Sequence, residues 1–305
     1  MFEFIIVFIV VLFFYIHIYH HIKTSNDLEI YDIPFTTRTK LDEICDIRQP
    51  TVFKLPVSLS SKTLTQICDN YGSFDVSIGK GDDWDSCVPI PLSNVMHILS
   101  NEDTDSSSEE KSKKYISENN SSFLQETNII KEIQKQDALI RPSLVSSCDY
   151  DMIVGNVNSY MCMRYHKEYR TLYTVHEGCV TIRLIPPSCS KYVFAEEDYG
   201  AMRFISPMNC WDIQPEYVKE FRKVKSIDII LKQGDTIYIP AYWWYSISFH
   251  ELSCIWVCKY QTWMSMISII PTYIMSFLQR SNIQHDMINK KVNIHNDINS
   301  NNDDI

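Results

Sequence analysis

Apolar positions follow three patterns along the chain, namely an unbroken run, helical spacing and short stretches of period two, and each pattern predicts a different kind of element. Residues 4–22 form an almost unbroken apolar run, which at about 1.5 Å per residue gives a helix long enough to cross a hydrocarbon core. Helical spacing then alternates with short stretches of period two, which predicts helices over 39–47, 64–71, 92–99 and 123–139 and strands over 51–55 and 74–78. Short apolar runs separated by polar turns predict strands over 160–165, 169–175, 179–185, 227–231, 236–239, 245–249 and 253–260.

Three further segments set the limits of the folded domain. Residues 263–278 are apolar, but Pro271 and several serines interrupt them, so we expect an amphipathic helix pair packed on the strands and not a second membrane span. Residues 101–122 are acidic and serine-rich, and both this insertion and the asparagine-rich end are expected to be disordered. The predicted units are an anchor over 1–23, one domain over 24–280 with a strand-rich core over about 149–260, and a tail over 281–305.

The N-terminal run favours a retained anchor over a cleaved signal peptide. A signal peptide needs a positive start and a small-residue cleavage site, whereas this chain begins Met1-Phe2-Glu3 and stays bulky up to Lys23. Positive charges follow the run and Glu3 precedes it, which predicts a single-pass membrane protein with its domain on the cytoplasmic side. The lipid bilayer is therefore an expected partner, through residues 4–22.

Composition narrows the classes of function. A formal net charge of −10 over 305 residues argues against a nucleic-acid partner, because nucleic-acid binding needs a basic face. The chain has neither a Walker nor a dinucleotide glycine pattern. Its ten cysteines are scattered without a Cys-x-x-Cys pair, which indicates free thiols in a reducing compartment and not a zinc site.

Two stretches carry the strongest functional signal. One runs from Gly234 to Trp244 as Gly-Asp, an apolar alternation, Ile-Pro and Trp-Trp; because proline cannot donate to a sheet ladder, Pro240 must end a strand. The other runs from Tyr165 to Pro187 as Tyr-His-Lys-Glu, a strand, Gly178 and Leu-Ile-Pro-Pro. Together they resemble the JmjC-type, cupin-like oxygenases. The resemblance implies a mainly β fold with flanking helices, a double-stranded β-helix (jelly-roll) barrel.

The same resemblance implies a site that has lost its chemistry. Such oxygenases hold iron with His-x-Asp/Glu and a distal histidine, and hold 2-oxoglutarate with a lysine. Counted back from Gly178, the first histidine position falls on Tyr165 and the carboxylate on Lys167. The distal histidine position falls on Tyr245, and the 2-oxoglutarate lysine position falls on Val180. The expectation is a degenerate site without iron or 2-oxoglutarate.

Two alternatives stay open. A shift by one residue gives His166 and Glu168, a permissible ligand pair for an Fe(II) and 2-oxoglutarate-dependent hydroxylase, although such a shift turns every side chain of a strand to the other face. Alternatively, Lys167, Tyr173 and Tyr245 would form a pocket that senses a small anion.

The anchor, combined with Asp198-Tyr199-Gly200 and the Phe-Ile-Ser-Pro turn at 204–207, also resembles membrane-anchored cupin-like proteins of large DNA viruses. That resemblance implies a viral or virus-modified membrane. The expected function is a non-catalytic, cupin-like binding or structural module, a pseudoenzyme with the bilayer and a further protein as partners.

Overall fold

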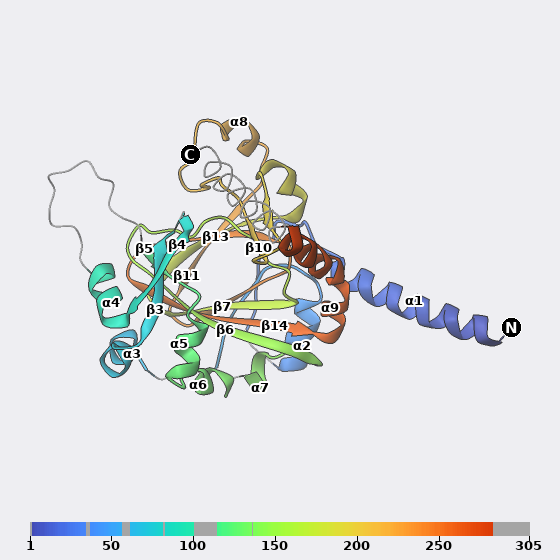
Figure 1. Cartoon of the computed structure of the whole chain (residues 1–305), viewed down its shortest axis with the longest axis horizontal. Coiled ribbons are helices and arrows are strands. Elements are labelled where there is room, and N and C mark those ends of the chain that lie inside the picture. Colours follow the sequence, from blue (N-terminus) through green and yellow to red (C-terminus); the bar gives the residue numbers. More distant parts are fainter. Residues whose placement is uncertain are drawn as a thin grey trace, which may run out of the picture.

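Two facing β-sheets form the body of the protein (Figure 1). The computed structural model describes residues 2–34, 37–56, 62–81, 83–100, 115–135 and 137–282. Within these residues the larger sheet has nine strands in the order β1-β2-β12-β7-β14-β6-β5-β3-β4. Their bounds are β1 (Tyr31–Asp32), β2 (Thr51–Lys54), β3 (Asp75–Lys80), β4 (Asp83–Pro91), β5 (Tyr115–Ser117), β6 (Val145–Gly155), β7 (Arg170–Glu177), β12 (Asp235–Ile239) and β14 (Ser253–Thr262).

The second sheet has the order β11-β8-β13 and faces the middle of the larger one. Its strands are β8 (Cys179–Ile185), β11 (Ile227–Lys232) and β13 (Trp244–Phe249). A separate pair, β9 (Glu196–Asp198) and β10 (Arg203–Ile205), lies in the long connection between β8 and β11. Side chains from both sheets form one apolar cluster between them, including Val175 and Val257 of the larger sheet and Ile182 and Ile247 of the smaller. The fold is mainly β with flanking helices, as the sequence predicts.

The chain passes from one sheet to the other at two corners. Gly178 separates β7 from β8 with a φ of +87°, a conformation that favours glycine, and its position leaves no room for a Cβ beside Ser253. Pro240 follows β12, and Tyr242 adopts a φ of +67° before β13 begins in the other sheet. The expectation that Pro240 ends a strand is confirmed.

Helices cover the outer face of the larger sheet. They are α2 (Arg38–Cys45), α3 (Leu64–Tyr71), α4 (Leu92–Ser100), α5 (Ser121–Glu126), α6 (Ile130–Gln134) and α7 (Asp137–Ile140). Apolar residues of these helices pack against Met152, Leu172 and Trp256 of the sheet. The remaining helices are a 3-10 turn (Pro187–Tyr192), α8 (Val218–Phe221), α9 (Trp263–Ser268) and a C-terminal helix over residues 270–282.

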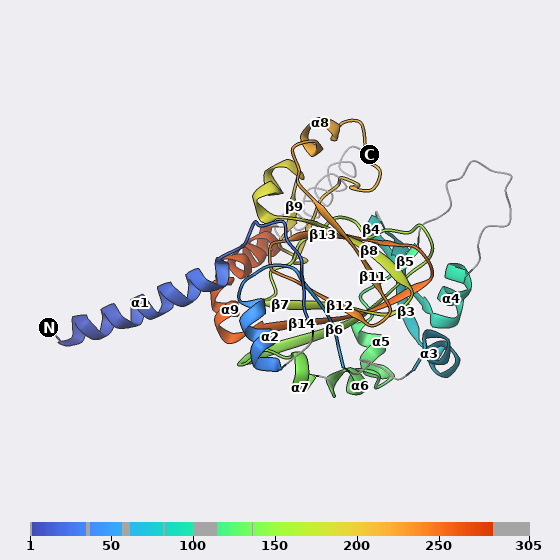
Figure 2. The same ribbon diagram turned by 180° about the vertical axis from the view of Figure 1, so that it is seen from behind.

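The N-terminal helix α1 (Phe2–Ile22) extends away from the domain, as both views show (Figures 1 and 2). None of its residues is buried, and it is long and apolar enough to cross a membrane. Its C-terminal end packs beside α9, where the His21 ring lies 5.3 Å from that of Tyr169.

Four sequence expectations need correction. Part of the stretch expected to be disordered, 101–122, is ordered: β5 and the start of α5 occupy its end, while residues 101–114 lie outside the described residues. The single helix expected over 123–139 is three short helices, and Asn128, with a φ of +57°, separates the first two. Residues 160–165 are not a strand and make only isolated bridges at Tyr160 and Arg164. The first two residues of the expected disordered tail continue the C-terminal helix, and its remainder is not described.

Candidate functional site

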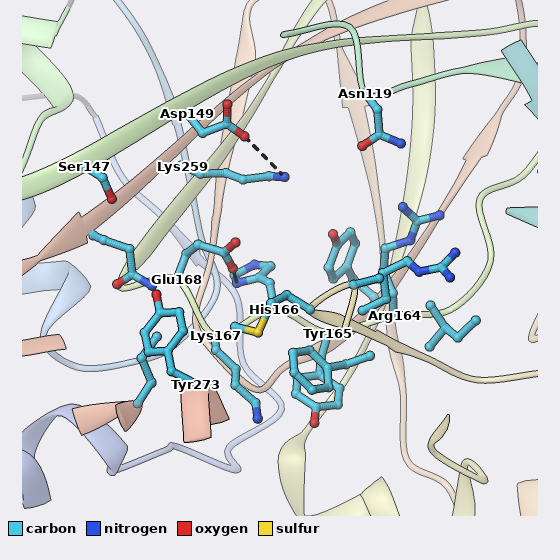
Figure 3. Close-up of a pocket in the computed structure, with 18 residues that line it drawn as sticks. Asn119, Ser147, Asp149, Arg164, Tyr165, His166, Lys167, Glu168, Lys259 and Tyr273 are labelled. Carbon is cyan, nitrogen blue, oxygen red and sulfur yellow. Dashed lines mark ion pairs between the residues drawn. The ribbon is translucent and has the colours of Figure 1, made fainter. Parts of the chain in front are cut away.

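A cavity of about 800 Å³ lies at one end of the barrel, between the strand-free segment 164–168, the strands β6, β13 and β14, and the loop that leads into β10 (Figure 3). Its polar side chains include Asn119, Asp149, Arg164, His166, Glu168, Tyr245 and Lys259. Loop, strand and helix residues that are far apart in sequence therefore converge at this cavity.

Strand parity decides which residues of the segment face the cavity. The backbones of Arg164 and Tyr245 exchange two hydrogen bonds, of 3.0 and 2.8 Å, so their side chains lie on the same side. His166 and Glu168 follow at intervals of two and lie on that side as well, and the His166 ring centroid is 5.6 Å from that of Tyr245. His166 and Glu168, the pair that the shift by one residue gives, therefore lie on the side of Tyr245.

Tyr165, Lys167 and Tyr245 line the same cavity, but the side chains of Tyr165 and Lys167 turn to the other side of the segment, toward Phe204. The Tyr165 ring stacks on Phe204, and its hydroxyl donates to Glu197 at 3.0 Å. Lys167 Nζ donates to Thr272 at 3.1 Å and lies 4.0 Å above the Phe204 ring. The physical reason is the bend at Tyr169, which interrupts the alternation before β7 begins.

His166 is a buried, neutral imidazole. Its Nδ1 lies 3.6 Å from a Glu168 carboxylate oxygen and 3.4 Å from the Thr171 hydroxyl. Its buried Nε2 has no hydrogen-bond partner in the described part of the chain. Burial is the main cause that lowers the pKa of His166 to about 4. Because Nδ1 faces a carboxylate and a hydroxyl, we assign the ring proton to Nδ1, which leaves Nε2 as an acceptor.

Glu168 and Lys259, which both line the cavity, carry opposite charges. Burial opposes the charge of Glu168, yet His166, Lys259 and backbone N–H groups together lower the pKa of its carboxyl. Burial likewise opposes the charge of Lys259, yet the carboxylates of Glu168, Asp151 and Asp149 together raise its pKa. The Lys259 ammonium lies 4.0 Å from Asp149 (Figure 3). Both groups are therefore charged at neutral pH.

The barrel interior behind Tyr245 is filled. The buried Tyr173 hydroxyl donates to the Tyr245 hydroxyl at 2.6 Å, and burial raises the pKa of Tyr245. Val180 is fully buried in the apolar cluster between the sheets. Of the pocket expected from Lys167, Tyr173 and Tyr245, Lys167 and Tyr245 line the cavity, and Tyr173 lies behind Tyr245.

Several cavity residues carry no signal in the sequence. Arg164 pairs with the buried Glu118 through two hydrogen bonds, of 2.8 and 3.3 Å, although the two are separated by 46 positions. Asn119 and Lys259 reach the cavity from other elements. Only for Arg164 does the sequence hold a signal: it precedes His166 by two residues and Glu168 by four, so the three would share one side of an extended segment.

The donor set does not fit an iron and 2-oxoglutarate centre. Such a centre needs two imidazoles and one carboxylate. Here His166 and Glu168 are joined by Tyr245, whose hydroxyl is engaged by Tyr173, and no cluster of three His, Cys, Asp or Glu side chains occurs among the described residues. Val180, where the resemblance places the co-substrate lysine, is enclosed by apolar side chains. No reaction step is therefore derived through iron.

Comparison with known families agrees with this architecture. The family model of the cupin-like domain matches residues 76–266, from β3 to within α9. The chain belongs to the cupin-like domain family. No curated protein matches the sequence.

Proposed function

We propose that this protein is a membrane-anchored, non-catalytic cupin-like protein that binds a small anionic molecule in the cavity. The observation that carries the proposal is the charge of the cavity lining. Four cationic side chains line the cavity, namely Arg164, Lys167, Arg203 and Lys259, against the two acids Asp149 and Glu168. Arg164 and Arg203 are paired with Glu118 and Asp198, so the ammonium groups of Lys167 and Lys259 are the cations that favour an anion in this chain of net charge −10.

The interior supports binding without oxygenase chemistry. Tyr245 and Tyr173 close the barrel where the deeper part of an oxygenase site would lie, and Val180 supplies no charge. The cavity offers donors instead: the amide of Asn119, the hydroxyl of Tyr245 and the ammonium of Lys259. These groups suit carboxylate or phosphate oxygens.

The anchor is α1, with the domain on the cytoplasmic side. Support comes from the exposed, apolar surface of α1 and from the positive residues that follow it. The resemblance to anchored viral proteins extends the proposal to a viral or virus-modified membrane, where the cavity or a surface of the domain would hold a protein partner.

Anion binding is tested by thermal shift with the full chain in detergent, using succinate, citrate, 2-oxoglutarate and inorganic phosphate as probes. We expect at least one probe to raise the unfolding temperature, because its binding energy adds to the stability of the folded state. Lys259→Met should abolish that shift, whereas Lys225→Met, which removes an exposed lysine outside the cavity, should leave it intact. Absence of a shift with every probe, or an equal shift in the Lys259→Met variant, contradicts anion binding.

One observation favours the hydroxylase as a second candidate: His166 and Glu168 do face the cavity, and His166 Nε2 is unpaired within the described residues. Anaerobic Fe(II) titration with metal analysis separates the two functions. Stoichiometric iron, together with 2-oxoglutarate turnover that His166→Ala abolishes, would establish the hydroxylase and refute the non-catalytic proposal. We expect neither.

A further inference from the structure

The C-terminal helix over residues 270–282 turns its apolar side to the outside and its polar side to the domain, the reverse of a helix that packs on a core in water. Its outward side carries the apolar residues Ile270, Tyr273, Ile274, Phe277 and Leu278, which are 42–70% exposed. With about 3.6 residues per turn, these positions share an arc of about 140°. The side turned toward the domain carries small polar residues instead.

The inward side is held by specific contacts, so the orientation of the helix is fixed. Thr272 and Ser276 are buried, and Thr272 accepts a hydrogen bond from Lys167. Gln279 and Arg280 both bond to the backbone of Gly200, Gln279 as acceptor and Arg280 as donor. A rotation that buried the apolar side would break these contacts. The expected helix pair is present and packs on the barrel, but this second helix does so by its polar side.

The exposed stripe lies next to the anchor. The C-terminal helix, dark red in Figures 1 and 2, lies at the root of α1 in both views, and α9 links the two by packing against α1. Trp263, at the start of α9, is 64% exposed, and its backbone N–H donates to Leu144, which is also exposed. Apolar side chains thus continue from the end of α1 onto the surface of the domain.

We propose that this surface, the stripe formed by Ile270, Tyr273, Ile274, Phe277 and Leu278, lies in the lipid bilayer beside α1 and gives the domain a second membrane contact. The inference rests on the proposed anchoring by α1. A helix whose apolar side faces outward and whose aromatic residues lie beside a spanning helix suits the interfacial region of a bilayer, where amphipathic helices bury one side among the acyl chains. Continuity with α1 is the reason to choose lipid over a second copy of the chain or another protein.

The contact would fix the direction of the cavity relative to the membrane. Tyr273, at the edge of the stripe, lines the cavity together with the neighbouring Ile269, and Thr272 holds Lys167. One short helix therefore has lipid on one side and the cavity wall on the other, so the cavity lies close to the membrane surface.

The test uses the full chain in nanodiscs that contain a phospholipid with a photoreactive diazirine in its acyl chain. Adducts are mapped by mass spectrometry after irradiation. We expect adducts on α1 and on residues 270–278, and none on Val88 or Ile230, which are exposed apolar residues on strands away from α1 (Figure 1). In an Ile274→Glu/Phe277→Glu variant, adducts on residues 270–282 should fall about tenfold, because carboxylates resist transfer into the acyl region. Adducts on α1 should not change.

A matched control carries the same charges elsewhere: Val88→Glu/Ile230→Glu should leave both sets of adducts as in the parent chain. Adducts confined to α1 would overturn the second contact while leaving the anchor intact. Adducts absent from α1 itself would refute the anchoring on which the inference rests. Protein–protein cross-links at residues 270–278 in place of lipid adducts would show that another chain covers the stripe, and would also overturn the proposal.

Discussion

Replacing Tyr245 with phenylalanine should destabilise the domain more than the same change at its partner Tyr173. Tyr173 is buried, and its hydroxyl donates to that of Tyr245, so Tyr245→Phe leaves a buried hydroxyl without an acceptor. Tyr245 lines the cavity, so its hydroxyl can bond to water when Tyr173 becomes phenylalanine. The two single substitutions therefore differ in what they leave behind.

The expected magnitudes follow from that difference. An unsatisfied buried hydroxyl costs about 1–3 kcal/mol, whereas loss of one hydrogen bond with solvent replacing the partner costs about 0.5–1.5 kcal/mol. For a domain of this size, about 1 kcal/mol lowers Tm by roughly 2–4 °C. We expect a decrease of about 4–8 °C for Tyr245→Phe and about 2–4 °C for Tyr173→Phe. The double variant should be no less stable than Tyr245→Phe alone, because neither hydroxyl then remains.

The assay is thermal unfolding of the full chain in detergent, followed by tryptophan fluorescence. All six tryptophans lie between residues 84 and 263, outside α1, so the signal reports the domain. Tyr31→Phe, at a half-exposed position on the edge strand, is the control and should change stability by less than about 0.5 kcal/mol. An equal or larger loss for Tyr173→Phe, or a double variant whose loss is the sum of the two, would refute the assigned geometry.

Three other predictions test the environment of the cavity and the sheet corners. The pKa of His166 is about 4 in the folded state and 6.5 in the unfolded chain, so the free energy of unfolding should be highest above about pH 7 and decrease by up to about 3 kcal/mol as the pH falls from 6.5 to 4. His166→Gln should flatten that part of the Tm–pH curve, and an unchanged curve would contradict the lowered pKa. Arg164→Met should lower the free energy of unfolding in urea by about 3–5 kcal/mol, because Glu118 stays buried without its cation. Adding Glu118→Leu should restore most of that stability, and a further decrease in the double variant would show that the two residues do not act as a pair. Gly178→Ala should destabilise far more than Gly234→Ala, because both have φ near +88° but only the first lacks space for a Cβ; equal Tm values would refute the packing at that corner.

Strands β2, β3, β7, β8 and β11 to β14 could be predicted from the sequence as short apolar runs between turns, whereas the long strands β4 and β6 were missed. The alternation in β8 and β12 requires nothing beyond local pattern, and the observed bounds agree closely with the expected ones. The helical stretch after residue 123 was harder, since nothing in the apolar spacing reveals that Asn128 takes a left-handed conformation.

Which residues of segment 164–168 face Tyr245 could not be predicted from the sequence. Counting from Gly178 back through β7 assumes an unbroken strand, but the bend at Tyr169 changes which side each earlier residue faces. His166 and Glu168 thereby lie beside Tyr245, whereas the side chains of Tyr165 and Lys167 turn to Phe204, although all four residues line the cavity. The orientation of the C-terminal helix had the same limit: an apolar stripe has one spacing whether it faces a core or lipid, and only the contacts of Thr272 and Ser276 distinguish them.

The segment between α1 and β1 has a consequence for any shortened form of this protein. Leu28 and Ile30 pack against the inner cluster, Asp27 accepts a hydrogen bond from Gln49 at 3.1 Å, and β1 then pairs in parallel with β2. A chain cut at residue 24 keeps β1 paired with the edge of β2. A chain that starts after β1 leaves the backbone N–H and C=O groups of β2 free to pair with another chain. Proteolytic release from the membrane would thus leave the edge of β2 covered if the cut falls before β1 and open if it falls after β1.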